Sequence, residues 1–141
     1  MSGSTKPNSI VMFNKLNLAA TLMGIANTLV HYSALRSLAI SKGASPAGPI
    51  LGIILVGLSY LIFWFFIFRR GSRAAKWLFV AATMIAVGMI PRSIGEVIAM
   101  GVPYAVIDGT SFVLQLAAAA MLFRSDAKDW LAHKNLEPAP V

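Results

Sequence analysis

The sequence contains no cysteine, which excludes disulfide bonds, thiolate nucleophiles and thiolate metal sites. Charge is also scarce: charged residues make up 12% of the chain, whereas a soluble domain has about 25%. There is no glycine-rich phosphate loop, no set of His, Asp and Glu at metal-ligand spacing, and no nucleophile elbow. We therefore expect no metal and no cofactor, and no motif assigns a catalytic residue.

Hydrophobic residues are abundant instead, at 57% of the chain, against about 45–50% in soluble domains. Pro49–Phe68 carries no charge, and a helix of that length spans roughly the 30 Å hydrocarbon core of a bilayer. The basic segment Arg69–Lys76 follows directly, and a second apolar run starts at Trp77. This order predicts a membrane hairpin with its basic turn in the cytoplasm.

By the same reasoning, the chain is predicted to be an all-α polytopic membrane protein, a four-transmembrane-helix antiparallel bundle over residues 16–123. The predicted spans are Leu16–Leu35, Pro49–Phe68, Trp77–Met100 and Tyr104–Phe123. Pro91 lies inside the third span. We expect a kinked helix that continues to Met100, and a helix that stops at Ile90 is the alternative.

Residues 1–15 and 124–141 are more polar and are predicted to be tails. A signal peptide is the alternative for the first tail, but Asn27 and His31 interrupt the apolar run and argue against cleavage. The second tail is expected to begin as a short amphipathic helix on the membrane surface, with Trp130 as an anchor, and to end in disorder.

The distribution of basic residues predicts the orientation. The chain has twelve Lys and Arg residues. With both termini on one side, that side holds nine of them: Lys6, Lys15, Arg69, Arg70, Arg73, Lys76, Arg124, Lys128 and Lys134. The other side holds Arg36, Lys42 and Arg92. The bias predicts that both termini are cytoplasmic, so we interpret the net charge of +7 as an orientation signal rather than a sign of nucleic-acid binding.

Four ionisable residues are predicted to lie at a similar depth in the outer part of the bilayer. Counted from the inner ends of their spans, His31, Arg92 and Asp108 each lie roughly 22 Å outward, and Glu96 lies about one turn further. Charged groups are costly in lipid, so we expect these side chains to turn into the bundle. Arg92 would bridge Asp108 and Glu96, and His31 would titrate beside them. An ion pair that only fixes helix register is the alternative.

Three further sets of residues are candidates for contacts. The secondary polar stripe consists of Asn27, Ser111 and Gln115. The candidate site for a lipid head group consists of Arg69, Arg70, Arg73 and Lys76, although topology alone explains these charges. Small residues four apart predict close helix packing, within one chain or between two copies: Ala20, Gly24 and Thr28; Gly48 and Gly52; Ala82 and Ala86.

Two stretches carry a resemblance. Residues Phe68–Gly88 read FRRGSRAAKWLFVAATMIAVG, and residues Gln115–Trp130 read QLAAAAMLFRSDAKDW. This pattern resembles small four-helix inner-membrane proteins of bacteria to which no function is assigned. The resemblance covers about the second half of the chain. It implies a bacterial inner membrane and a four-helix bundle, and it brings no catalytic residue.

Three functions are compatible with the sequence. The first is a non-enzymatic accessory or structural membrane protein that binds a larger membrane complex or lipid. The second is an oligomeric transporter or channel, in which Asp108, Ser111 and Gln115 face a water-filled axis. The third is a membrane enzyme on a lipid-soluble substrate, with acid–base groups among Glu96, Asp108 and His31. We favour the first, because four spans with few polar groups leave little room for a substrate path.

Overall fold

The computed structural model describes residues 6–134, and this part of the chain is helical with no strand. The elements are α1 Asn8–Val30, α2 Tyr32–Ser41, α3 Gly48–Phe63, the π-helix η1 Trp64–Arg69, α4 Arg73–Ala99, α5 Val102–Met121 and α6 Ser125–Lys134. Four segments within this range are long and apolar enough to cross a membrane: α1, α3 continued by η1, α4 and α5. The predicted all-α four-helix membrane bundle is confirmed.

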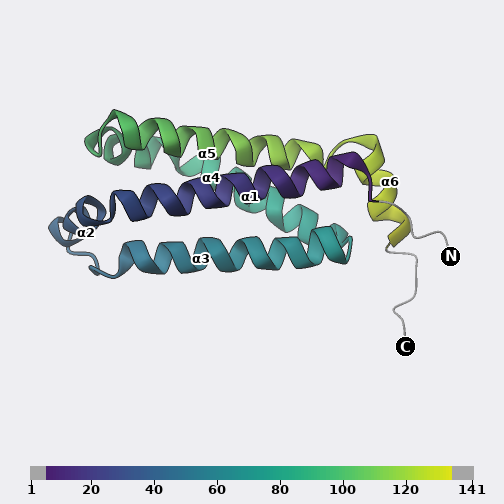
Figure 1. The fold of residues 1–141 in the computed structure, drawn as a ribbon, viewed down its shortest axis with the longest axis horizontal. Helices are drawn as coiled ribbons and strands as arrows, with labels where there is room; N and C mark the ends of the chain where they lie inside the picture. Colours follow the sequence, from purple (N-terminus) through teal and green to yellow (C-terminus); the bar gives the residue numbers. More distant parts are fainter. Residues whose placement is uncertain (1–5, 135–141) are drawn as a thin grey trace.

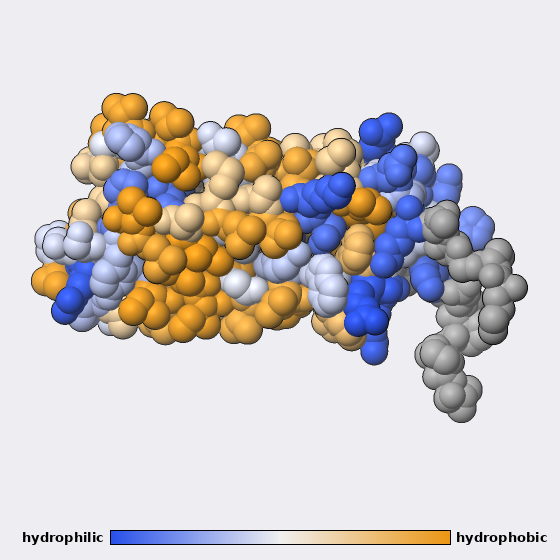
Figure 2. Space-filling model, viewed as in Figure 1, coloured by the Kyte–Doolittle hydropathy of each residue, from blue (hydrophilic) through white to orange (hydrophobic). Residues whose placement is uncertain are grey.

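The four long helices run side by side, and the two short helices lie at opposite ends (Figure 1). α6 and the start of α1 occupy one end, which we call the terminal end. α2 and the turn between α4 and α5 occupy the other, which we call the loop end. α1 makes its most extensive contact with α5. Hydrophobic side chains cover the middle of the visible face, and hydrophilic ones gather at the terminal end (Figure 2).

The first helix begins earlier than predicted. α1 begins at Asn8 instead of Leu16, and the residues predicted to be a tail carry Ile10 and Phe13, which are fully buried. These two positions lie on the same helix face as Asn17 and Ala20, so packing against the core holds the polar-rich start in a helix. The predicted disorder of the last residues falls outside the described part of the chain.

The second difference lies between the first two spans. α1 ends at Val30, His31 separates it from α2, and α2 is helical to Ser41, where a loop had been predicted from Arg36. The breakers Gly43 and Pro46 therefore end a short extra helix rather than the first span. The physical reason is that α2 contains no glycine or proline and no buried residue, so the helix propensity of its own residues determines that it is helical.

The hydrophobic core is concentrated at the terminal end. Phe79 of α4 contacts Phe13 and Phe63 edge to face, with ring centroids 5.2 and 5.1 Å apart. Around them the buried residues come from all the elements at this end: Ile10, Ile67, Ala75, Ala118, Ala119, Leu122, Ala127, Trp130 and Leu131. α6 is thus part of the core, rather than lying on the bilayer as an independent amphipathic helix.

The turn between η1 and α4 is tightly built. The N–H of Arg70 donates to the carbonyl of Phe65 at 3.1 Å, which is the wider bonding step of a π-helix. Gly71 follows with φ +65°, a conformation that favours glycine. The Ser72 hydroxyl then accepts from the N–H of Ala75 at 3.2 Å and caps α4.

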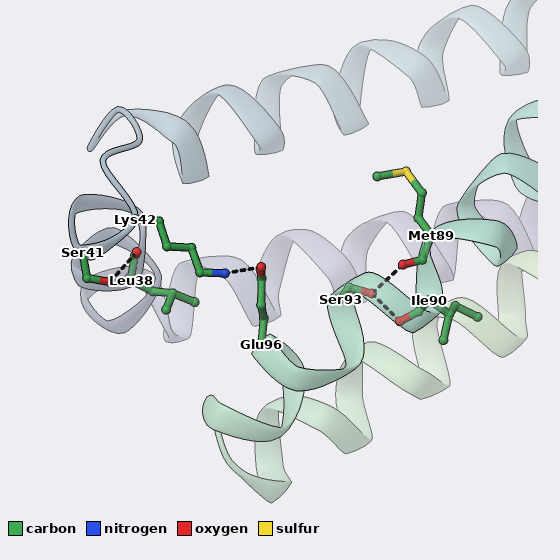
Figure 3. Close-up of polar contacts among 7 residues, drawn as sticks. All are labelled: Leu38, Ser41, Lys42, Met89, Ile90, Ser93 and Glu96. Atoms are coloured by element: carbon green, nitrogen blue, oxygen red, sulfur yellow. Dashed lines mark hydrogen bonds and ion pairs between the residues drawn. The ribbon is translucent and has the colours of Figure 1, made fainter.

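α4 continues through Pro91 to Ala99, which confirms that the third span does not stop at Ile90. Pro91 cannot donate a backbone hydrogen bond, so the ladder is interrupted at that point. The Ser93 hydroxyl, two residues later, donates to the carbonyls of Met89 and Ile90 at 3.4 and 3.2 Å (Figure 3).

Candidate functional site

A cavity of about 370 Å³ lies in the middle of the bundle, between α1, α3, α4 and α5. Small residues make room for it on α1, α3 and α4: Ala20, Gly24, Gly52 and Ala82. Its polar lining consists of Asn17, Thr21, Thr28, Ser59, Tyr60, Asp108, Ser111 and Gln115. A polar cavity among membrane-crossing helices is the feature of this fold best suited to hold a ligand.

The α5 side of the cavity is formed by the three polar residues that the sequence predicted to share one face of the fourth span. Asp108, Ser111 and Gln115 all line it. The Ser111 hydroxyl donates to the carbonyl of Ala20 at 2.8 Å, so it joins α5 to α1. A Cβ placed on Gly24 would lie 3.6 Å from the same hydroxyl oxygen, which shows how closely the two helices approach. The predicted small-residue face of α1 thus packs within one chain.

Asp108 and Gln115 have unused hydrogen-bonding capacity. Within residues 6–134, neither side chain has a hydrogen-bond partner, and Asp108 forms no ion pair. The hydroxyls of Thr21 and Thr28, in contrast, donate to carbonyls of their own helix at 2.8 and 2.9 Å. Among the described residues, Asn17 of α1 and Ser59 of α3 also have no side-chain hydrogen bond, but Asp108 carries the only carboxylate among the lining residues.

Aromatic and apolar side chains close the cavity toward the terminal end. Phe63 and Phe79 belong both to its lining and to the core contacts described above. Beyond Gln115, Ala118 of α5 and Leu122, which directly follows α5, are completely buried. The cavity is thus a pocket with an apolar floor, and no polar path continues along α5.

The predicted cluster of four ionisable residues does not assemble. Glu96 forms an ion pair with Lys42, which reaches it from the end of α2 (Figure 3). Arg92 is exposed, and no carboxylate in the part of the chain described here pairs with it. The predicted bridge from Arg92 to Asp108 and Glu96 is therefore absent. For Glu96 the reason is the extra helix α2, which brings Lys42 to the loop end and offers Glu96 another partner.

His31 and Asn27 lie together, one turn from Asp108 toward the loop end. The His31 ring stacks edge to face on Tyr104 of α5, with centroids 5.2 Å apart, and its Nδ1 lies 3.0 Å from the carbonyl oxygen of Asn27. The Asn27 amide donates to the carbonyl of Tyr104 at 3.2 Å. Neither residue lines the cavity. These contacts join the end of α1 to α5 on the loop-end side of the central cavity.

The basic turn divides into two parts. Arg69 and Arg70 lie over the rings of Trp64 and Phe65, at 5.9 and 4.9 Å from the ring centroids. Arg73 and Lys76, one turn later, line a separate cavity at the start of α4. The four cations predicted to form one head-group site thus lie in two groups with different surroundings, and only Arg73 and Lys76 line a cavity.

Sequence reasoning named Ala20, Gly24, Thr28 and Gly52 only as packing positions, and it missed the other polar residues that line the central cavity on α1 and α3. Asn17 and Thr21 extend the small-residue face of α1 by steps of three and four, and this spacing was the available signal. Ser59 and Tyr60 gave no signal, because they are isolated polar groups in an apolar span. The Tyr60 hydroxyl donates to Asn14 Oδ1 at 3.3 Å and ties α3 to α1.

The described residues contain no group of three His, Asp or Glu side chains placed to hold a metal ion. Comparisons with protein-family models, with curated proteins and with solved structures found no match to this chain.

Proposed function

We propose that this chain is a non-enzymatic integral membrane protein that binds a small lipophilic molecule in the central cavity. The observation that carries the proposal is a membrane-embedded cavity whose carboxylate, Asp108, has no partner within the described chain. An ionisable group among membrane helices is expensive to keep without a partner. A ligand with a hydrogen-bond donor or a positive charge would supply one.

The size and lining of the cavity support this class of ligand. A volume of about 370 Å³ is at the small end of the range for ligand pockets. Ile25, Ile53 and Val56 provide apolar wall, while Asp108 and Gln115 provide acceptors on one side. A molecule with an apolar body and one polar end fits such a lining, and it would enter from the bilayer.

The geometry supports the other two functions less well. A channel needs a continuous polar path, but the apolar floor at Phe63 and Phe79 interrupts it. The polar stripe faces the inside of one chain, so an axis between copies would not be lined by it. An acid–base enzyme would need a second free group beside Asp108, whereas Glu96 is already paired with Lys42. An accessory role in a larger membrane complex stays a prediction.

We also propose a bacterial inner membrane as the location, with both termini cytoplasmic. The terminal end of the bundle holds nine of the twelve basic residues. Basic residues favour the cytoplasmic side of a membrane protein.

Filling the cavity tests the ligand proposal. Gly52 lines the cavity and Gly57 does not, and both lie in α3 with open space where a side chain would begin. The protein is purified in mild detergent, and organic molecules enriched over a detergent blank are quantified by mass spectrometry. We expect Gly52→Leu and Asp108→Asn each to reduce the amount of the enriched molecule at least about tenfold. The first variant fills the space that the molecule occupies, and the second removes the charge of the carboxylate that it contacts.

Gly57→Leu is the matched control and should retain the molecule, because the same change is made on the same helix outside the cavity. Equal retention in all variants would contradict the proposal, as would a wild-type protein that enriches nothing over the blank.

A further inference from the structure

A second cavity, of about 450 Å³, lies at the terminal end where α4 begins. Three elements build it: the first turn of α4, the residues after α5, and α6. Its lining consists of Arg73, Lys76, Trp77, Phe123, Lys128 and Leu131. Three of these six residues are cations and two are aromatic, and none is acidic. This cavity does not share a residue with the central one.

Lys76 is the unusual member of this set. It is only 7% exposed, although lysine is almost never buried without a partner. Within the described residues it has no hydrogen bond and no ion pair, and the neighbouring charges acting on it, Lys128 and Arg73, are also positive. Its ammonium lies 4.4 Å from the centroid of the Phe123 ring and 5.7 Å from that of Trp77.

The helix dipole adds to the positive charge of this cavity. Arg73 and Lys76 lie in the first turn of α4, where the helix dipole favours an anion and opposes a cation. The nearby carboxylates of α6 do not compensate, since neither Asp126 nor Asp129 forms an ion pair with any of them. An anion in this cavity would meet three cations at the positive end of a helix.

We propose that this cavity binds the phosphate group of an anionic phospholipid. Lys76 would be the buried contact, with Arg73 and Lys128 at the rim. Trp77 and Phe123 are 60% and 39% exposed, and their rings pack edge to face with centroids 5.8 Å apart. Aromatic rings of this kind lie at the level of the lipid head groups, so they would contact the glycerol and the first acyl carbons.

The depth of the cavity favours a lipid over phosphate from solution. α4 is a membrane-crossing helix, and the cavity lies at its first turn, where head groups are found. Arg69 and Arg70 are at the same end but outside the cavity, over Trp64 and Phe65. The proposal is therefore a defined site rather than a general attraction between basic residues and anionic lipid. It is independent of the ligand proposed for the central cavity.

Native mass spectrometry of the full chain tests the site. The detergent-solubilised protein is mixed with equal amounts of phosphatidylglycerol and phosphatidylcholine, and the bound lipids are counted. The wild type should retain phosphatidylglycerol preferentially. We expect Lys76→Gln/Lys128→Gln to lower the ratio of bound phosphatidylglycerol to phosphatidylcholine about tenfold, because charge-assisted bonds to phosphate are lost.

The matched control is Arg69→Gln/Arg70→Gln, which removes two positive charges from the same end. It should change the ratio less than about twofold, because exposed charges on a protein surface contribute little interaction energy. Equal effects of the two double variants would overturn the proposal. So would displacement of the lipid by excess inorganic phosphate, because the site would then serve a soluble anion. If the buried Lys76 variant does not fold, Lys128→Gln alone must still lower the ratio more than Arg70→Gln alone.

Discussion

Glu96 and Asp108 show two ways in which a carboxylate in an apolar chain avoids lipid. Glu96 lies near the end of α4 and pairs with Lys42 at the loop end, where both side chains are about half exposed. Asp108 lies further along α5 and faces the central cavity. Helical spacing predicts the second arrangement, since Ser111 and Gln115 share a face with Asp108. It cannot predict the first, because 54 residues separate the two partners.

Gly71 is the residue whose substitution has the clearest expected cost. It has φ +65°, and a Cβ there would lie 2.9 Å from Lys134 Cβ and 3.1 Å from Trp130 Cζ3. Gly71→Ala therefore combines backbone strain with a clash against α6. We expect a loss of about 2–3 kcal/mol in the free energy of unfolding, measured by denaturant titration in detergent micelles.

Gly43→Ala separates the two causes. Gly43 has a similar φ of +69°, but a Cβ added there would have no atom within 4 Å, so only backbone strain of about 1 kcal/mol should result. Equal losses in the two variants would show that α6 does not press against the turn.

α6 depends on a contact with the start of α1. The backbone N–H of Ser9 donates to Asp126 Oδ2 at 3.3 Å, in the first turn of α6. Hydrogen bonding from Ser9, together with the backbone N–H of Ala127 and the positive charge of Arg124, holds the pKa of Asp126 below its ordinary value of 3.8. Two segments that the sequence places at opposite ends of the chain are thus joined.

This contact predicts a pH dependence for the docking of α6. A carboxylate whose pKa is lower in the folded state stabilises that state at neutral pH, and its contribution disappears as the pH falls through the folded pKa. We expect backbone amides of α6 to exchange with deuterium faster below about pH 4, after correction for the intrinsic rate. In Asp126→Asn the exchange should already be faster at neutral pH and should show a smaller change on acidification. An identical pH profile in the two proteins would refute the assignment.

The helices themselves follow from the sequence to different degrees. α3 and α5 could be predicted closely because their apolar runs are bounded by Pro49 and by the turn at Gly101. The start of α1 could not, because polar residues and Lys15 break up the apolar run of Asn8–Lys15, and contacts of Ile10 and Phe13 with distant elements hold it helical. α4 passes Pro91 as expected, since bonds within a membrane helix have no competition from water.

At the level of the whole molecule, composition and charge pattern determine the bundle, and the site needs the three-dimensional arrangement. Polar residues on α5 indicated one wall of the central cavity. The opposite wall depends on the gap left by Gly52 and on the approach of Tyr60 to Asn14, which no local spacing encodes. The cavity at the terminal end likewise needs α6 folded back beside Lys76, so the sequence showed only a basic segment.

The arrangement of the whole chain in the membrane can be tested because it has no cysteine, so a single introduced thiol has no background. Ser45 lies at the loop end and Ser125 at the terminal end, and both are exposed. If the terminal end is cytoplasmic, a membrane-impermeant maleimide added to intact bacterial cells should label Ser45→Cys and should label Ser125→Cys only after permeabilisation. Neutralising Arg69, Arg70 and Arg73 together should not invert this result, because the terminal end would still hold twice as many basic residues as the loop end. Labelling of Ser125→Cys in intact cells, with Ser45→Cys protected, would reverse the orientation and place the proposed phospholipid site in the opposite leaflet.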